Sequence, residues 1–155
     1  MSYRSSLGAV AALVLAACGG SKAPSTAVAP APSAERAVQD FMRAVADSNL
    51  TKMAQLWGSA KGSAAATGEP ADYQRRVLIM QAYLRGAEYR IMSNDPAPDA
   101  PGQRILQVEL KREHCDKTIP FTVLRSGDVW LVNKVDLGAA GSPGRPCDAP
   151  ASTQP

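Results

Sequence analysis

The sequence predicts an α+β fold, in which N-terminal helices pack on one face of a curved antiparallel sheet of about four strands. Apolar residues recur at steps of three and four over residues 34–84, the period of an amphipathic helix. After Gly86 apolar and polar residues alternate, the period of a strand with one buried face. Helices therefore precede a meander of strands, an order typical of α+β domains.

Two helices are expected before the first glycine-rich segment. Residues 34–46 form the first, because Ser33 is a good N-cap and the apolar side chains that follow share one face. Residues 50–57 repeat this spacing over a shorter length, and Gly58 ends the second helix. Residues 59–68 are small and carry little pattern, so we expect a loop there.

A third helix is expected to open at Pro70, which suits a first helical turn, and to end at Gly86. Its main apolar face is formed by Tyr73, Val77, Met80 and Leu84. Ile79 and Tyr83 widen that face, which predicts that the helix is covered on two sides.

Four strands are expected after this helix. Their predicted ranges are residues 87–93, 103–114, 118–125 and 129–137. Leu106, Val108 and Leu110 share one phase of the second strand and should face the helices. Ser126 and Gly127 predict a tight hairpin turn between the last two strands.

Residues 1–17 have the features of a targeting segment. Arg4 stands without an acidic neighbour and precedes an apolar run that is shorter than the roughly 20 residues needed to span a membrane. The run ends in Leu15-Ala16-Ala17-Cys18, which resembles the lipobox of bacterial lipoproteins. The resemblance implies cleavage before Cys18, a diacylglyceryl thioether on its sulfur and a third acyl chain on the new amine. The alternatives are an ordinary secretory signal with an incidental cysteine, or a buried helix.

The remaining chain divides into three segments. Residues 18–32 form the lipidated cysteine and a flexible Pro/Ser/Ala linker, residues 33–138 one small domain, and residues 139–155 a Pro/Gly-rich tail. Gly19, in place of an aspartate, favours the periplasmic face of the outer membrane by the same resemblance. The whole chain carries a net charge of +3, and its basic residues are scattered, which argues against nucleic acid as a partner.

The domain resembles nuclear transport factor 2-like domains. The resemblance rests on residues 37–45 and 50–57 as a helix pair carrying an aromatic residue, and on residues 129–135 as a last strand with an early Trp. Such domains form a cone whose interior can bind small molecules or hold an Asp or His base. They usually place a small hairpin after the second helix, and residues 59–68 look too short for one, so a reduced cone is expected.

Cys115 and Cys147 are the two cysteines left once Cys18 is lipidated. In an oxidising compartment such a pair usually forms a disulfide, which would hold the tail against the sheet. A metal site that includes His114, and unpaired or intermolecular thiols, are the competing interpretations.

No catalytic or cofactor motif is visible, and we expect neither a metal nor a cofactor. His114 shares the phase of Leu110 and could point towards the core as a base, although a polar residue at a strand end is the simpler interpretation. Asp40 is expected on a solvated helix face. The side chains that could line a pocket, with Trp57 and Trp130 the leading candidates, are Trp57, Tyr73, Met80, Tyr83, Tyr89, His114 and Trp130.

Two functional hypotheses follow. The first, which we favour, is a lipid-anchored, non-catalytic module that binds a protein or another envelope component. The second is a small-molecule binder, or an enzyme of the isomerase or cyclase kind, that uses the interior of the cone.

Overall fold

The computed structural model describes residue 29 and residues 31–148 of the chain. Cys18 and the targeting segment lie outside the described residues, as does the end of the tail. The larger helices are α1 (Ala34–Ala46), α2 (Leu50–Leu56) and α4 (Tyr73–Leu84), with a short α3 (Ala64–Thr67) between the last two. The main strands are β3 (Glu88–Pro96), β4 (Gln103–Lys111), β5 (Asp116–Ser126) and β6 (Val129–Val135).

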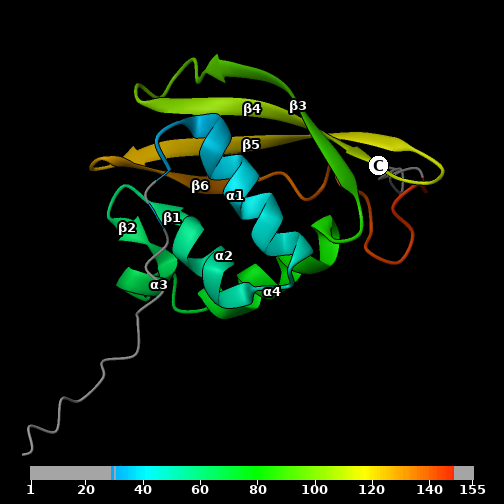
Figure 1. Cartoon of the computed structure of the whole chain (residues 1–155), viewed down its shortest axis with the longest axis horizontal. Coiled ribbons are helices and arrows are strands. Elements are labelled where there is room, and N and C mark those ends of the chain that lie inside the picture. The colour runs from blue at the N-terminus through cyan, green and yellow to red at the C-terminus, as the bar shows by residue number, and fades with distance from the viewer. Residues whose placement is uncertain (1–28, 30, 149–155) are drawn as a thin grey trace, which may run out of the picture.

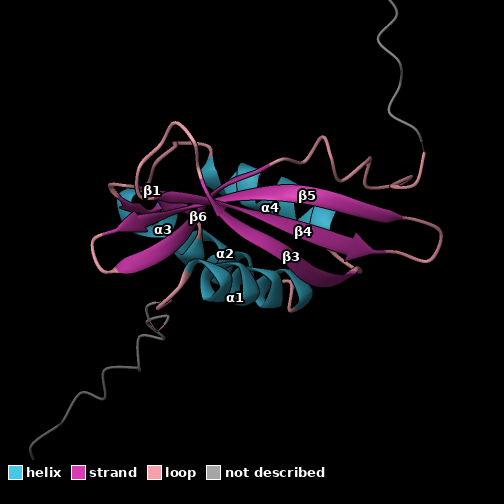
Figure 2. Cartoon of the chain, turned by 90° about the horizontal axis from the view of Figure 1, so that it is seen from above, coloured by secondary structure: helices cyan, strands magenta, loops and turns pink. Residues whose placement is uncertain are grey.

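The expected α+β fold is confirmed. The four main strands form one antiparallel sheet in the order β3-β4-β5-β6, and the sheet curves over the helices (Figure 1). Seen from above, the strands fan out with a strong twist while α1 and α2 lie together on one side (Figure 2).

Helix α1 begins and ends where the sequence predicts. The Ser33 hydroxyl accepts a hydrogen bond from the backbone N–H of Arg36 at 3.2 Å, which caps the first turn. Phe41 reaches from the middle of the helix to Phe121 on β5, with ring centroids 6.4 Å apart in an edge-to-face arrangement. Both side chains are fully buried, so this pair occupies the centre of the core.

The alternation predicted for β4 is confirmed. Leu106, Val108 and Leu110 are fully buried on the helix side, while the intervening Gln107 and Glu109 are only partly buried. On β5 the residues Ile119, Phe121 and Val123 continue the same face. The strand itself ends at Lys111, three residues earlier than expected, and β3 extends to Pro96.

The prediction of a loop at residues 59–68 is wrong. The segment contains a small hairpin of β1 (Gly58–Ser59) and β2 (Gly62–Ser63), followed by α3. The hairpin is held by contacts with β6 and the end of β5. The Asn133 side chain donates to the carbonyl of Gly58 at 2.8 Å, and the Ser126 hydroxyl donates to that of Ala60 at 3.2 Å. A Cβ at position 58 would lie 2.2 Å from the carbonyl oxygen of Gly62, so only glycine fits this close approach.

Two predictions for the third helix are also wrong: its start at Pro70 and its burial on two sides. Pro70 lies before α4, where its carbonyl accepts a hydrogen bond from the N–H of Tyr73 at 2.8 Å and closes a turn. Val77 and Leu84 are buried on the inner face of α4, but Ile79 is 39% exposed and Leu78 is 53% exposed. Within the described chain, therefore, protein covers only one side of this helix.

The chain after β6 packs back onto the domain. Ala140 is fully buried and belongs to the core, and Leu137 packs against it. Figure 1 shows the last described residues, coloured red, near the β4–β5 hairpin. None of the helices among residues 31–148 is long and apolar enough to cross a membrane.

Candidate functional site

The space between α1 and the sheet is occupied by side chains. Phe41 and Phe121 fill its centre, and Leu106, Val108 and Leu110 close it from β4. The residues that the sequence nominates for a pocket do not converge there. They lie instead along several separate surface hollows, or outside them.

Met80 packs in the core, and Trp57 is the most deeply buried of the aromatic candidates. Its indole N–H donates to the backbone carbonyl of Asn133 at 2.8 Å, and Trp57 forms a bridge with Val132 on β6. Its polar tip is therefore used to hold the α2 end against the sheet. Trp57 contributes an edge to two shallow hollows but has no free donor to offer a ligand.

The other aromatic candidates lie apart from one another. Tyr73 lines a hollow of about 480 Å³ between α2 and α4, together with Leu50 and Leu78. Tyr83 and Trp130 are partly buried and pack against the core. Trp130 donates its backbone N–H to the carbonyl of Ala31 at 3.3 Å, which places the start of the described chain beside β6.

His114 does not face the core. Because β4 ends at Lys111, residues 112–115 form a turn closed by a hydrogen bond from the Arg112 N–H to the Cys115 carbonyl at 3.1 Å. The alternation that would have turned His114 inwards therefore stops before it, and its side chain is 78% exposed. Its nearest charged neighbour is Glu113, 3.9 Å from Nε2. The alternative of an inward-facing base is therefore wrong, and His114 is an exposed polar residue just beyond the strand end.

The predicted disulfide between Cys115 and Cys147 is confirmed. The two Cα atoms are 5.6 Å apart, and the bond joins the β4–β5 turn to the C-terminal segment. The disulfide lies close in sequence to Arg112. The Arg112 guanidinium donates to the carbonyl of Tyr83 at 2.7 Å and so connects this turn to the end of α4. Burial lowers the pKa of Arg112. Among residues 31–148 there is no group of three or more His, Cys, Asp or Glu side chains placed to hold a metal.

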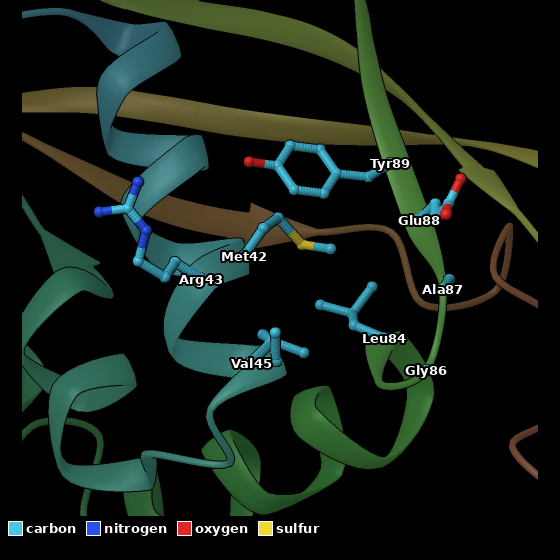
Figure 3. Close-up of a pocket in the computed structure, with 9 residues that line it drawn as sticks. Met42, Arg43, Val45, Leu84, Gly86, Ala87, Glu88 and Tyr89 are labelled. Atoms are coloured by element: carbon cyan, nitrogen blue, oxygen red, sulfur yellow. The ribbon is translucent and has the colours of Figure 1, made fainter.

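One hollow that combines polar and apolar groups lies between the second half of α1 and the start of β3 (Figure 3). Its volume is about 530 Å³. Met42, Val45 and Leu84 form an apolar floor, and Arg43 and Tyr89 stand at its edge. The Tyr89 ring points from β3 across the hollow towards α1, as Figure 3 shows.

The electrostatics of Tyr89 reflect this position. Burial raises the pKa of its hydroxyl, and this outweighs the opposing influence of the Arg43 cation. Asp40 raises the same pKa and Arg36 lowers it, to smaller extents. The hydroxyl therefore stays protonated at neutral pH and can donate a hydrogen bond to a ligand.

Asp40 is not on a solvated face, as the sequence suggested. The residue is only 9% exposed, and its carboxylate lies 3.1 Å from Nε of Arg36 and 3.9 Å from Nη1 of Arg43. These two arginines are one turn away on either side, so they neutralise Asp40 along the helix surface. The carboxylate is thus committed to ion pairs and is poorly suited to act as a base.

A polar network at the start of α1 was not visible in the sequence. Asn94 of β3 donates to the Glu35 carboxylate, and Arg104 of β4 donates to both the side chain and the backbone carbonyl of Asn94. A β-bulge at Met92 shifts the register so that Asn94 faces α1. Alternation counted from Tyr89 places residue 94 on the outer face, so the sequence pattern could not reveal the contact. The hydrogen bond from Asn94 is the main cause that lowers the pKa of Glu35.

Comparisons with protein-family models, curated proteins and solved structures found no match for this chain. Its function is therefore argued from the geometry above and from the sequence. The class that these define is an α+β domain with a filled interior, a disulfide-bound C-terminal segment and surface hollows along its helices.

Proposed function

We propose that this chain is a lipid-anchored cell-envelope lipoprotein whose domain, of the nuclear transport factor 2-like type, acts as a non-catalytic binding or accessory module. The Leu15-Ala16-Ala17-Cys18 string supports the anchor. The disulfide supports an oxidising compartment, since such bonds persist mainly outside the cytosol. The observation that carries the non-catalytic part is the filled interior, with Phe41 at its centre and His114 outside it.

The three cysteines provide a matched test of the anchor. In cells fed an alkyne-labelled fatty acid, the wild-type chain should become labelled and appear in the membrane fraction. Cys18→Ser should lose both, whereas Cys147→Ser should keep both because it removes only the disulfide. Mass spectrometry that finds residues 1–17 intact and Cys18 unmodified would contradict the proposal.

The binding role has its own test. The lipoprotein, crosslinked in native membranes and recovered under denaturing conditions, should bring one envelope protein with it reproducibly. Charge changes on the exposed sheet surface should reduce that yield, while changes in the core should act only through folding. Repeated recovery of the chain alone would remove the protein-binding version of this role.

The hollow beside Tyr89 supports a second candidate, a small-molecule binder. Its apolar floor and Arg43, whose side chain is 58% exposed and contacts Asp40 only at 3.9 Å, suit an amphipathic anion, such as a ligand with a carboxylate and an apolar body. The enzymatic version of this hypothesis relied on His114 as a base inside the cone, and His114 lies outside the interior.

An anionic naphthalene dye can probe this hollow. Dye fluorescence should rise on binding, Arg43→Gln should weaken the binding, and Ala46→Trp should block it because residue 46 lines the hollow. Ala66→Trp on α3 adds the same ring at an exposed position elsewhere and serves as the control. Equal binding by all four proteins would eliminate this site.

A further inference from the structure

Helix α4 presents a second apolar surface, which the fold leaves uncovered. Its outer stripe consists of Arg75, Leu78, Ile79, Ala82 and Arg85, which recur at helical spacing. Leu78 is 53% exposed and Ile79 is 39% exposed. Among the described residues, four large apolar side chains are classed as exposed, and these two are joined by a third, Leu50, on the adjacent helix α2.

Leu50 and Leu78 also flank a recess. They line the hollow of about 480 Å³ between α2 and α4, whose floor includes Ala54 and Val77. The hollow is mainly apolar and is large enough to receive part of an acyl chain. The outer stripe and this hollow form one continuous surface along α4.

The charges around this surface are mainly positive. Arg75 and Arg85 lie at the two ends of the outer stripe and are exposed, and neither forms an ion pair with another of the described residues. No acidic residue occurs between Tyr73 and Ala87, and Asp72 just before the helix pairs with Arg76 at 2.9 Å. Apolar side chains framed by arginines are the composition of helices that lie in the headgroup region of anionic bilayers.

We infer that the outer stripe and the adjoining hollow rest on an anionic phospholipid bilayer. The inference relies on the proposed anchor, because so small a surface would bind a membrane only weakly by itself. Twelve residues lie between Cys18 and Ala31, and a fully extended chain over those thirteen steps spans about 43 Å. The linker is thus long enough to let α4 reach the membrane, and tethering raises the effective concentration of the surface there.

The test uses the full-length lipoprotein with an environment-sensitive thiol probe at Leu78→Cys. The matched control carries the probe at Met92→Cys, since Met92 on β3 is 51% exposed and lies outside the outer stripe. Each protein is placed in vesicles of equal parts phosphatidylethanolamine and phosphatidylglycerol that contain brominated acyl chains, or in phosphatidylcholine vesicles with the same bromination. Bromine should quench the probe at residue 78 in the anionic vesicles and leave the probe at residue 92 bright.

Arginine variants test whether charge contributes to the binding of α4 to the anionic membrane. Arg75→Gln and Arg85→Gln should each lower the ratio of membrane-contacting to free α4 roughly fivefold, the effect expected for one basic side chain near an anionic surface. Lys111→Gln with Lys117→Gln, at the β4–β5 end of the sheet, should leave it unchanged.

Three outcomes would overturn the inference: equal quenching at residues 78 and 92, quenching that ignores the arginines, or shielding of residue 78 by self-association in the absence of vesicles. Mass spectrometry of the same samples separates the two proposals. If Cys18 is lipidated and residue 78 stays in water, this inference fails and the anchor remains. If Cys18 carries no lipid, the anchor fails, and the vesicle measurement then decides whether the stripe binds unaided.

Discussion

Helices α1 and α4 carry apolar residues at the same spacing, yet the fold uses them differently. Helix α1 buries a broad face that includes Val38, Phe41 and Val45, and its outward arginines pair with Asp40. Helix α4 buries Val77 and Leu84 but leaves Leu78 and Ile79 in water. Folding therefore buries nearly all of the apolar surface of α1 but leaves part of that of α4 exposed. The exposed apolar residues of α4 are therefore candidates for contact with a partner.

The largest expected effect is the difference in stability between a variant in the core beneath α1 and a variant on the outer face of α4. Phe121→Ala should lower the free energy of unfolding by about 3–5 kcal/mol, because it removes a fully buried ring that packs against Phe41. Leu78→Ala should change it by less than about 0.5 kcal/mol, since the side chain is largely exposed. Urea denaturation followed by circular dichroism measures both. A comparable loss in the two variants would mean that Leu78 is covered within the folded chain, and the contrast between the helices would disappear.

The disulfide is expected to have the next largest effect. It joins residues 32 positions apart, and loss of such a crosslink destabilises a fold by about 3–4 kcal/mol in the chain-entropy model. Cys115→Ser with Cys147→Ser should therefore lower the unfolding midpoint strongly. The exposure of Leu78 should not change, because the bond lies at the β4–β5 turn. Equal midpoints for oxidised and reduced wild-type protein would show that the C-terminal segment is held by its packing at Ala140 alone.

A smaller loss is expected where α2 meets the sheet. Asn133→Ala removes the donor to the carbonyl of Gly58, a buried residue at the base of the β1–β2 hairpin. Leaving that carbonyl without its partner should cost about 1–3 kcal/mol. Lys134→Ala, at the next and exposed position of β6, is the control and should be nearly neutral. A neutral Asn133→Ala would indicate that water replaces the lost donor.

Local periodicity predicted what depends on local sequence. The bounds of α1, the inward phase of Leu106 and the hairpin turn at Ser126 all follow from patterns within a few residues. The β1–β2 hairpin did not, because it is stabilised by Asn133 and Ser126, which lie far along the chain. Among site features, the disulfide was predictable from cysteine count, whereas the hollow at Tyr89 depends on the approach of β3 to α1.

Two features of the site depend on where strand alternation breaks. The inward alternative for His114 extended the alternation of β4 too far, and the predicted strand at residues 87–93 stopped before Asn94, which β3 includes after a register shift. Strand β4 ends before His114, and a bulge at Met92 reverses the phase before Asn94. Alternation gives reliable directions only inside an unbroken ladder, and the sequence does not mark where a ladder breaks.

The smallest predicted effect concerns the network that attaches α1 to the sheet. The hydrogen bond from Asn94 holds the pKa of Glu35 below its ordinary value of 4.5, which means that the folded state favours the carboxylate. A carboxyl whose pKa is lowered on folding stabilises the protein above its unfolded pKa, and this contribution is lost as the pH falls through the folded pKa. Because Glu35 is partly solvated, the contribution should be under about 1 kcal/mol.

Glu35→Gln should remove this contribution while keeping an oxygen that can accept from Asn94. At neutral pH the variant should be less stable than the wild type by that small amount, and the difference should vanish below the folded pKa of Glu35. Asn94→Ala removes the donor on β3 that lowers the pKa of Glu35. This variant should therefore lack the same pH-dependent contribution to stability. Urea unfolding at a series of pH values measures all three proteins. If the gap between wild type and Glu35→Gln persists unchanged into acid, the attachment depends on the shape of the side chain rather than on its charge. The junction of α1 with β3 would then depend on packing, as the inner face of α4 does at Val77 and Leu84.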